Sequence, residues 1–470
     1  IDTMIHNMMM MEQSYTYNPP APAPAYYMVN RPYENVHYNM TQSYSDTRVQ
    51  PDIEIIAEVS PPPSHPGEQL PQRQTVEEPH VSWLHPRNCY DLYHSLLSPY
   101  ERNEIFSHSR IYYVGQYVGR KAPGRKILGT FSVESNFGFD DAEGGYNIVL
   151  NDHVAYRYEI LRVLGKGAFG QVLKVYDHKT KELAALKIVR NEERFLQFAH
   201  TEVKILEQLL REDAADTANV VHIQNSFMFR NHACIVFELM SINLFEVNKK
   251  NKFRGFSLKL VRSFAHSLTI ALKVLKRNQI IHGDLKPENI MLKQPGKSGL
   301  KVIDFGSSCY TESRLLTYIQ SRFYRAPEVI LGCPIGVEID MWSLGCILAE
   351  LMLGYPLLPG HNEEDQMALM IEMFGIPPPS LREKSSKWSR FFSVSRVPHY
   401  LMTRVTSLEL RRGSPHSRPI AMVLGDLVRQ EEDRFMLDFI SKCLAWEPWS
   451  RLSPQTALSH PWLRSYRSRQ

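Results

Sequence analysis

Two short segments of this sequence carry side chains that suit the transfer of a phosphoryl group. The sequence HGDLKPEN begins at His282, and DFG begins at Asp304. Asp284 can accept the proton of an attacking hydroxyl group, and Lys286 can neutralise charge on the transferring phosphoryl group. Asn289 and Asp304 offer the oxygen ligands that Mg²⁺ prefers, and that ion would bind together with nucleotide phosphates. Because both segments occur in this order and at this spacing, they predict a phosphoryl-transfer centre that uses ATP and Mg²⁺.

A glycine-rich segment upstream predicts a loop that binds the phosphates of ATP. The sequence LGKGAFGQV begins at Leu164, and residues 171–176 alternate as a strand. A dinucleotide-binding fold would instead place a helix directly after the third glycine. An ordinary glycine-rich hairpin is the other interpretation of this segment taken alone, since glycine is common in tight turns. The predicted ATP contacts here are Leu164, Gly165, Lys166, Gly167, Ala168, Phe169, Gly170 and Val172.

Lys187 lies inside the apolar run 184–189, where an unpaired ammonium group would be costly to bury. Glu202, on the core side of the helix expected next, is the natural partner. In kinases such a pair holds the lysine on the α- and β-phosphates of ATP. The alternative is a surface lysine whose stem lies along the protein while its charge stays in water. We predict the pair and count both residues with the catalytic set.

Further residues are expected around the adenine ring. Phe237 would narrow the back of the nucleotide pocket, and Met291 would form its floor. Glu238 and Met240 would offer backbone hydrogen bonds at the connection between two lobes. Ordinary core packing is the alternative for Phe237 and Met291. The predicted set is Ala185, Phe237, Glu238, Met240, Asn243 and Met291.

These side chains require a cleft between two differently built lobes. Short β-branched runs at 158–164, 172–176 and 184–189 predict strands, and a helical stretch at 195–211 follows them. Two more strand-like runs precede a mainly helical remainder. A strand-rich small lobe before a helical large lobe predicts an α+β, bilobal fold. The main helical stretches are 258–275, 337–353, 365–374 and 434–444.

The chain of 470 residues divides into zones of different composition. Residues 1–79 are rich in Pro, Tyr, Asn, Met and Ser, and their few aliphatic residues predict a disordered tail. Apolar periodicity returns in residues 80–157, which predict a small accessory domain, and within them 111–115 is typical of a strand that ends on glycine. The catalytic domain is expected at 158–463, and a short tail at 464–470.

Composition narrows the class of protein. The formal net charge is only +4, which disfavours a nucleic-acid binder that works by neutralising phosphates. Six scattered cysteines without CxxC pairs indicate reduced thiols in an intracellular protein. No apolar run approaches the roughly 18–20 residues of a membrane-spanning helix. We expect a monomer that acts on protein substrates in the cytoplasm, with the nucleus as a second location. The sequence begins with Ile1, so its true start is expected to lie upstream.

Three further segments resemble the dual-specificity tyrosine-regulated kinases (the DYRK family). YIQSRFYRAPE, which begins at Tyr318, is similar to the end of that family's activation segment. FDDAEGGY, which begins at Phe139, resembles the family's homology box. LSPYE, which begins at Leu97, resembles the accessory domain of the class 2 branch. The similarity extends over most of the chain beyond residue 80.

The resemblance implies a dual-specificity kinase that phosphorylates Ser and Thr, often before proline, and autophosphorylates one tyrosine of its activation loop. Tyr318 occupies the matching position. Phosphorylation there would add roughly −1.5 to −2 charge. Arg322 and Arg325 lie close in sequence, and their fork-shaped guanidinium groups suit a phosphotyrosine.

The sequence also departs from the family pattern. Gly283 precedes the catalytic aspartate, where many kinases have arginine and this family usually has cysteine. Leu316 replaces the first of two family tyrosines, which favours Tyr318 as the single regulatory tyrosine. The alternative from another class is a pseudokinase scaffold that recruits partners through the N-terminal region. An active kinase is the preferred interpretation, because the sequence contains all four groups that the reaction needs, namely Lys187, Asp284, Asn289 and Asp304.

Overall fold

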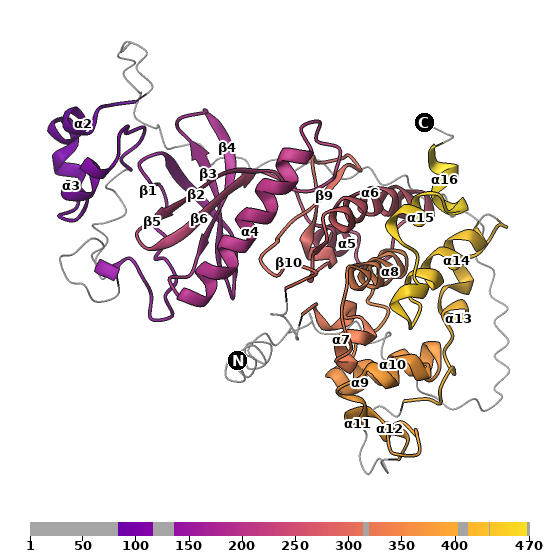
Figure 1. The fold of residues 1–470 in the computed structure, drawn as a ribbon. Helices are drawn as coiled ribbons and strands as arrows, with labels where there is room; N and C mark the ends of the chain where they lie inside the picture. The colour runs from indigo at the N-terminus through magenta and orange to yellow at the C-terminus, as the bar shows by residue number, and fades with distance from the viewer. Residues whose placement is uncertain (1–82, 116–135, 314–318, 403–411, 432, 468–470) are drawn as a thin grey trace, which may run out of the picture.

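The strand-rich lobe and the helical lobe predicted from the sequence are both present in the computed structural model. They lie side by side, with two short helices beyond the outer end of the strand-rich lobe (Figure 1). The predicted α+β bilobal fold is therefore confirmed. The predicted disordered tail at 1–79 lies outside the described residues. The structure describes residues 83–115, 136–313, 319–402, 412–431 and 433–467.

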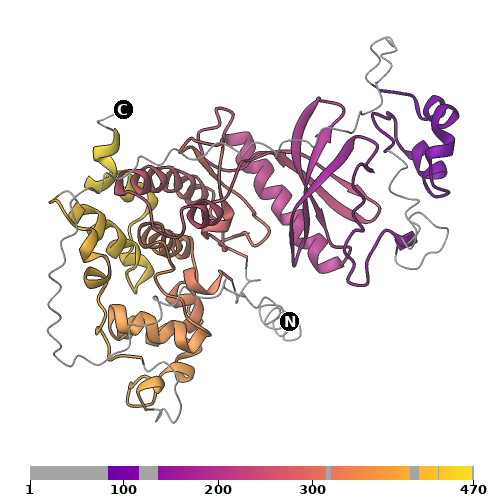
Figure 2. The same cartoon turned by 180° about the vertical axis from the view of Figure 1, so that it is seen from behind.

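One antiparallel sheet of six strands forms the smaller lobe, in the order β1-β2-β3-β4-β6-β5. Residues of β3 alternate between buried and partly exposed, because successive side chains of a strand point to opposite faces. Helix α4 (Glu193–Glu212) lies across this sheet (Figures 1 and 2) and buries Phe195, Ile205 and Leu206. The strands are β1 (His153–Val154), β2 (Tyr158–Gly167), β3 (Gly170–Asp177), β4 (Glu182–Val189), β5 (Ile223–Phe229) and β6 (His232–Glu238).

Helix α8 (Glu338–Leu353) is the centre of the larger lobe. All of its residues from Ile339 to Met352 are buried, as expected for a helix that is apolar on every side. Helices α6 (Leu258–Arg277) and α14 (Asp433–Cys443) pack directly against it. The other helices are α5 (Leu244–Lys250), α7 (Pro327–Leu331), α9 (Glu363–Phe374), α10 (Pro379–Lys384), α11 (Trp388–Phe391), α12 (His399–Met402), α13 (Ile420–Leu424), α15 (Pro454–Leu458) and α16 (Pro461–Arg467).

Two short antiparallel ribbons fix the segments that carry the candidate chemistry. In one ribbon β7 (Ile280–Ile281) pairs with β10 (Cys309–Tyr310). In the other, β8 (Ile290–Leu292) pairs with β9 (Leu300–Val302). HGDLKPEN connects β7 to β8, and DFG follows β9, so the two ribbons bring both segments to one place.

The accessory segment contains α2 (Pro86–Tyr93) and α3 (Glu101–Glu104). The predicted strand at 111–115 is wrong, because only Ile111 pairs, in an isolated bridge with Leu84. The next two backbone N–H groups both donate to the carbonyl of Tyr156, at 2.9 and 3.1 Å. The chain therefore bends around Tyr156 rather than continuing a ladder.

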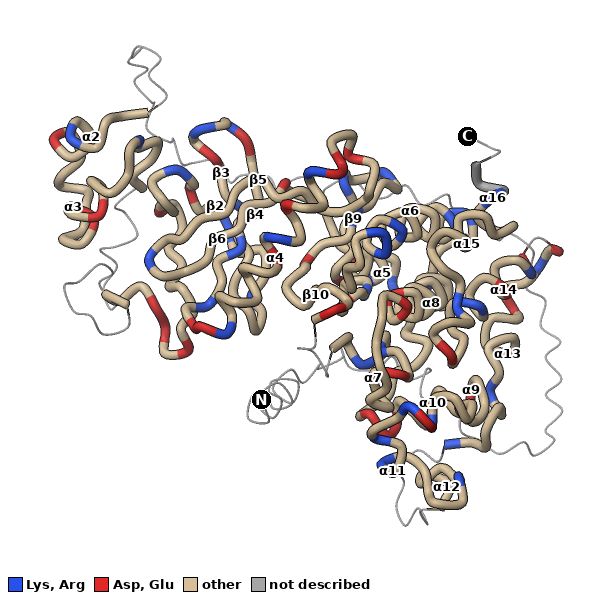
Figure 3. The backbone as a smooth tube through the Cα atoms, viewed as in Figure 1, with Lys and Arg blue, Asp and Glu red and all other residues tan. Residues whose placement is uncertain are grey.

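Positively and negatively charged residues are interspersed along the backbone of both lobes (Figure 3). Among the residues that the structure describes, no helix has both the length and the apolar character needed to cross a membrane.

Candidate active site

The glycine-rich segment forms the turn between β2 and β3, as the sequence predicted. Its first two glycines, Gly165 and Gly167, have no atoms within 4 Å of the position a β-carbon would take. Gly170 has a φ of +148°, and a β-carbon there would collide with the backbone of Ile188. The turn thus leaves open space beside the backbone, which is what close approach to phosphates requires.

Lys187 lies at the centre of a buried charge cluster. Its Nζ donates to both carboxylate oxygens of Glu202 at 2.9 Å and to Oδ1 of Asp304 at 3.0 Å. Lys187 is only 8% exposed and Glu202 only 2%. Burial disfavours the ammonium form, but the charges of Asp304 and Glu202 outweigh it and raise the pKa of Lys187. Lys187 is therefore held in its charged form and is bonded to Asp304, the first residue of DFG.

Asp284 is held by groups from three positions of the chain. Its Oδ1 accepts a hydrogen bond from the hydroxyl of Ser321 at 2.7 Å, and its Oδ2 contacts Lys286 Nζ at 2.8 Å. Asn289 donates to the backbone carbonyl of Asp284 at 2.9 Å and to its Oδ2 at 3.1 Å. Lys286 also donates to the Ser321 hydroxyl at 3.1 Å. These bonds leave the aspartate carboxylate little freedom to rotate.

Asp340 at the start of α8 fixes the backbone ahead of this aspartate. Its carboxylate accepts from the N–H of His282 at 2.7 Å and from that of Gly283 at 3.1 Å. The ring of His282 packs edge-on against Phe305, and its Nε2 lies 3.0 Å from the carbonyl of Ile303. His282 therefore joins the two motifs structurally.

Asn289 and Asp304 fit a hard divalent cation, since they supply amide and carboxylate oxygens on facing segments. Burial alone would raise the pKa of Asp304, but the charge and hydrogen bond of Lys187, with His282 and Lys286, bring it down to about 2. The carboxylate is thus ionised throughout the physiological range. A magnesium ion held there would neutralise negative charge on the nucleotide phosphates.

The strands and the inter-lobe connection gather the residues predicted around adenine. Ala185 pairs with Phe237 between β4 and β6, and Asn243 bridges to Met291 beside β8. Asn243 also caps α5 through its side chain. The carboxylate of Glu238 contacts Lys301 Nζ at 2.5 Å and accepts from the N–H of His222 at 2.7 Å. These side-chain bonds leave the backbone groups of Glu238 available for adenine, and the backbone contacts of Glu238 and Met240 with adenine stay a prediction.

A protein kinase domain model matches residues 158–463. Human dual specificity tyrosine-phosphorylation-regulated kinase 4 is 46% identical over 401 residues, which are 85% of this chain and 73% of that protein. This chain belongs to the DYRK family. Human dual specificity tyrosine-phosphorylation-regulated kinase 3 is 47% identical over 393 residues (82% of this chain, 66% of that protein). Kinase mbk-2 of Caenorhabditis elegans is 48% identical over 387 residues, 81% of this chain and 47% of that protein. The chain thus spans about half the length of some curated relatives, and the resemblance inferred from sequence is confirmed.

Tyr318, the predicted site of autophosphorylation, lies outside the described residues. Both predicted phosphotyrosine donors follow it closely. Arg322 donates to the carbonyl of His361 at 2.6 Å and lies partly exposed. Arg325 is fully buried and contacts Glu363 at 3.1 Å. A phosphotyrosine would therefore share Arg325 with this carboxylate, and the assignment of both arginines stays a prediction.

Sequence reasoning missed two groups that complete this DYRK-family site. Ser321 bonds to both catalytic-loop charges, but a serine next to Arg322 gives no sequence signal for that contact. Glu350, inside α8, accepts from the hydroxyl of Tyr324 at 2.7 Å. Burial raises the pKa of Glu350 to about 8. The sequence did offer a signal for Glu350, because a glutamate inside an otherwise apolar helix is expected to be buried and therefore to need a partner.

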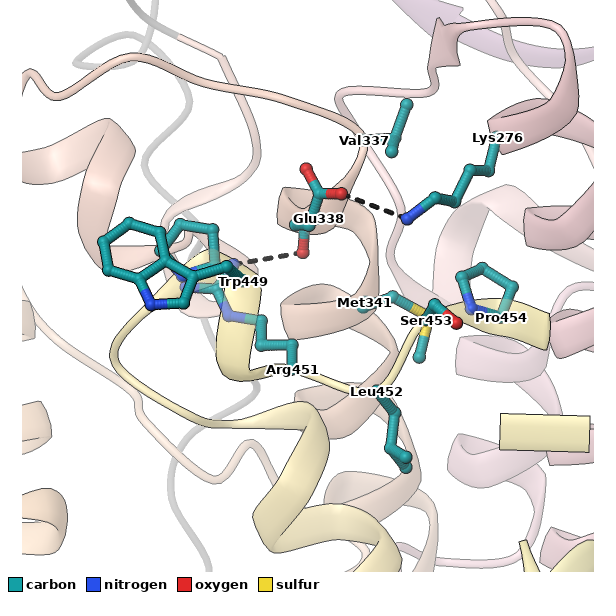
Figure 4. A pocket seen from close by; sticks show the side chains of 10 residues that line it. Lys276, Val337, Glu338, Met341, Trp449, Arg451, Leu452, Ser453 and Pro454 are labelled. Atoms are coloured by element: carbon teal, nitrogen blue, oxygen red, sulfur yellow. Dashed lines mark hydrogen bonds and ion pairs between the residues drawn. The ribbon is translucent and has the colours of Figure 1, made fainter. Parts of the chain in front are cut away.

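A separate cavity of about 240 Å³ lies away from the catalytic groups, between the end of α6, the start of α8 and residues 448–454 (Figure 4). Lys276 contacts Glu338 across it at 3.2 Å, and Arg451 donates to the backbone carbonyl of Glu338 at 3.0 Å. Arg451 also forms a buried bidentate pair with Glu328 at 2.6 Å. Lys276 thus joins α6 to α8, and Arg451 joins residues 448–454 to both α7 and α8.

Proposed function

We propose that this chain is an ATP-dependent protein kinase that phosphorylates Ser and Thr of protein substrates, often before proline, and autophosphorylates Tyr318. The observation that carries the proposal is the assembled set of Lys187 paired with Glu202 and Asp304, beside Asp284 and Asn289. Phosphoryl transfer relies mainly on positioning and on electrostatic stabilisation, and these groups supply both.

Each side chain has a defined task in this proposal. Lys187 binds the α- and β-phosphates and is itself oriented by Glu202. Asp284 accepts the hydroxyl proton of the substrate and orients its oxygen toward the γ-phosphate, while Lys286 offsets the charge that spreads over the phosphoryl oxygens. Asn289 and Asp304 hold the metal ion.

The test compares wild type with Asp284→Asn in two assays. A thermal shift measures the binding of Mg·ATP, and radiolabel transfer to a generic protein substrate measures catalysis. We expect Asp284→Asn to bind ATP and to transfer at least about 100-fold more slowly. Asp91→Asn, in the exposed ion pair with Arg87, is the matched control and should behave as wild type. Equal transfer by Asp284→Asn would remove the assignment, and wild-type binding without transfer would favour the pseudokinase scaffold.

We propose in addition that Glu288 and Glu350 favour a basic residue upstream of the acceptor. Oε2 of Glu288 is buried and has no hydrogen-bond partner among the described residues. Burial raises the pKa of Glu288, and its charge contributes to the raised pKa of Glu350. The charge of Lys286 acts on Glu288, but no group donates a hydrogen bond to its buried Oε2 among the described residues. An arginine of the substrate would supply that donor.

A peptide array tests this preference. Glu288→Gln should reduce the ratio of kcat/KM for arginine-containing over alanine-containing peptides by about 10-fold or more, because a hydrogen bond between charged groups is replaced by a neutral one. An unchanged ratio would exclude Glu288 from substrate selection.

Maturation is tested separately by Tyr318→Phe. The variant should contain no phosphotyrosine after expression and should have lower activity. Unchanged phosphotyrosine by mass spectrometry would assign the modification to another tyrosine.

A further inference from the structure

Phe169, at the tip of the glycine-rich turn, packs its ring against helix α4. The ring centroids lie 5.7 Å from Phe195 and 6.3 Å from Phe198, with interplanar angles of 85° and 89°. Both are edge-to-face arrangements, which the quadrupoles of aromatic rings favour. The carbonyl of Phe169 also accepts a hydrogen bond from the N–H of Arg190 at 3.0 Å. The sequence predicted Phe169 as an ATP contact, and this stays a prediction; the ring itself packs on the helix.

The rest of the turn has few other attachments. Gly165 and Gly167 have open space beside them. Lys166 lies 3.7 Å from Asp141, but the lysine side chain is 57% exposed, and such exposed pairs contribute little. Phe169 is therefore the main apolar side chain that holds the tip of the turn.

Helix α4 also carries Glu202, the partner of Lys187. Phe198 precedes Glu202 by four residues, so the two side chains lie on the same face, one turn apart. Phe195 is 4% exposed and belongs to the core, while Phe198 is only partly buried. A change at Phe198 consequently tests the contact with Phe169 with little disturbance of the lobe's core.

We propose that Phe169, Phe195 and Phe198 form an aromatic contact that fixes the phosphate-binding turn to α4. Through this contact the turn and the Lys187–Glu202 pair adopt their nucleotide-binding positions together. Phe198 is then a positioning residue for ATP, which it does not touch. The inference rests on the ATP binding contained in the proposed function.

The experiment is a double-mutant cycle of Phe169→Ala and Phe198→Ala in the full chain. The Kd of the magnesium complex of AMP-PNP, a non-hydrolysable ATP analogue, is measured by calorimetry, and KM for ATP and kcat by phosphotransfer. Each single variant should raise the Kd by about 2- to 10-fold, the range expected for an aromatic pair. The double variant should have the Kd of Phe169→Ala rather than the product of both effects, because removal of Phe169 already removes its contact with Phe198. KM for ATP should change more than kcat.

Phe198→Tyr keeps the ring and should have the wild-type Kd. Phe198→Leu keeps apolar volume without the ring and should have a raised Kd. Phe198→Leu also replaces Phe198→Ala in the cycle if the alanine variant does not fold. Phe106→Ala, which removes a half-exposed ring packed on Tyr90 in the accessory segment, is the matched control with unchanged Kd.

Kd effects that multiply in the double variant, or a Kd that Phe198→Ala leaves unchanged, would overturn the inference. A wild-type protein that binds AMP-PNP with the expected cycle but transfers no phosphate would contradict the proposed function and leave this contact supported.

Discussion

Replacement of Gly283 by alanine should destabilise the protein through two separate features of the backbone. Gly283 has a φ of +76°, and a β-carbon there would come within 2.9 Å of the carbonyl oxygen of Ser307. The left-handed conformation costs an L-residue about 1–2 kcal/mol. The position cannot relax easily, because its N–H donates to Asp340 at 3.1 Å and its carbonyl accepts from the N–H of Gln320 at 2.7 Å.

We therefore expect Gly283→Ala to lower the free energy of unfolding by about 1–3 kcal/mol, the left-handed cost plus a small steric strain. Chemical denaturation with urea measures it from the change in midpoint at constant m value. Gly283→Cys, which restores the residue usual in the family, should cost a similar amount, because cysteine also carries a β-carbon. Activity should fall only modestly, since Asp284 keeps its bonds to Ser321 and Lys286.

Gly299→Ala is the matched control. Its β-carbon would meet only the flexible side chain of Lys293 at ordinary contact distance, 3.8 Å, and its φ is not in the left-handed region. This variant should be within about 0.5 kcal/mol of wild type. If Gly283→Ala were as stable as Gly299→Ala, the strain argument for the catalytic loop would be refuted.

Three further predictions concern stability and rate. Arg230→Met removes the guanidinium shared by the carboxylates of the buried Glu101 and the partly buried Glu104, at 3.1 and 2.7 Å. This should lower the free energy of unfolding by about 3–5 kcal/mol, measured by denaturation. An unchanged stability would contradict the role of these ion pairs in anchoring the accessory segment. Glu350 has a folded-state pKa of about 8 against an ordinary value of 4.5, so unfolding releases a proton between these values and stability falls as pH rises through them. Glu350→Gln should abolish that fall, with its largest gain over wild type above pH 8, and parallel stability–pH curves would exclude Glu350 as the cause. Ser321→Ala should lower kcat by about 10- to 100-fold with little change in KM for ATP, because a hydrogen bond to the catalytic carboxylate is lost; single-turnover kinetics would show a normal rate if that bond were dispensable.

The sequence predicted the elements of the catalytic lobes well, because their apolar periods are long and their ends carry turn residues. The helix expected at 258–275 is α6, Leu258–Arg277, and the strand expected at 184–189 is the main part of β4, Glu182–Val189. The strand expected at 111–115 failed because its backbone N–H groups bond to Tyr156, a partner that no local pattern reveals. Short apolar runs are the least certain basis for assigning strands.

The sequence by itself was enough to predict the chemistry proposed for this protein, because the groups that phosphoryl transfer needs lie in short contiguous motifs such as HGDLKPEN and DFG. It also indicated Glu202 as the partner of Lys187, since a buried lysine on a strand requires a carboxylate close by. Only the tertiary structure decided which distant groups complete the site. Asp304 reaches Lys187 across 117 positions of sequence, and Ser321 reaches Asp284 across 37. Such contacts depend on the paths of backbone that lie between the residues, and those paths are fixed by the packing of whole lobes rather than by local pattern.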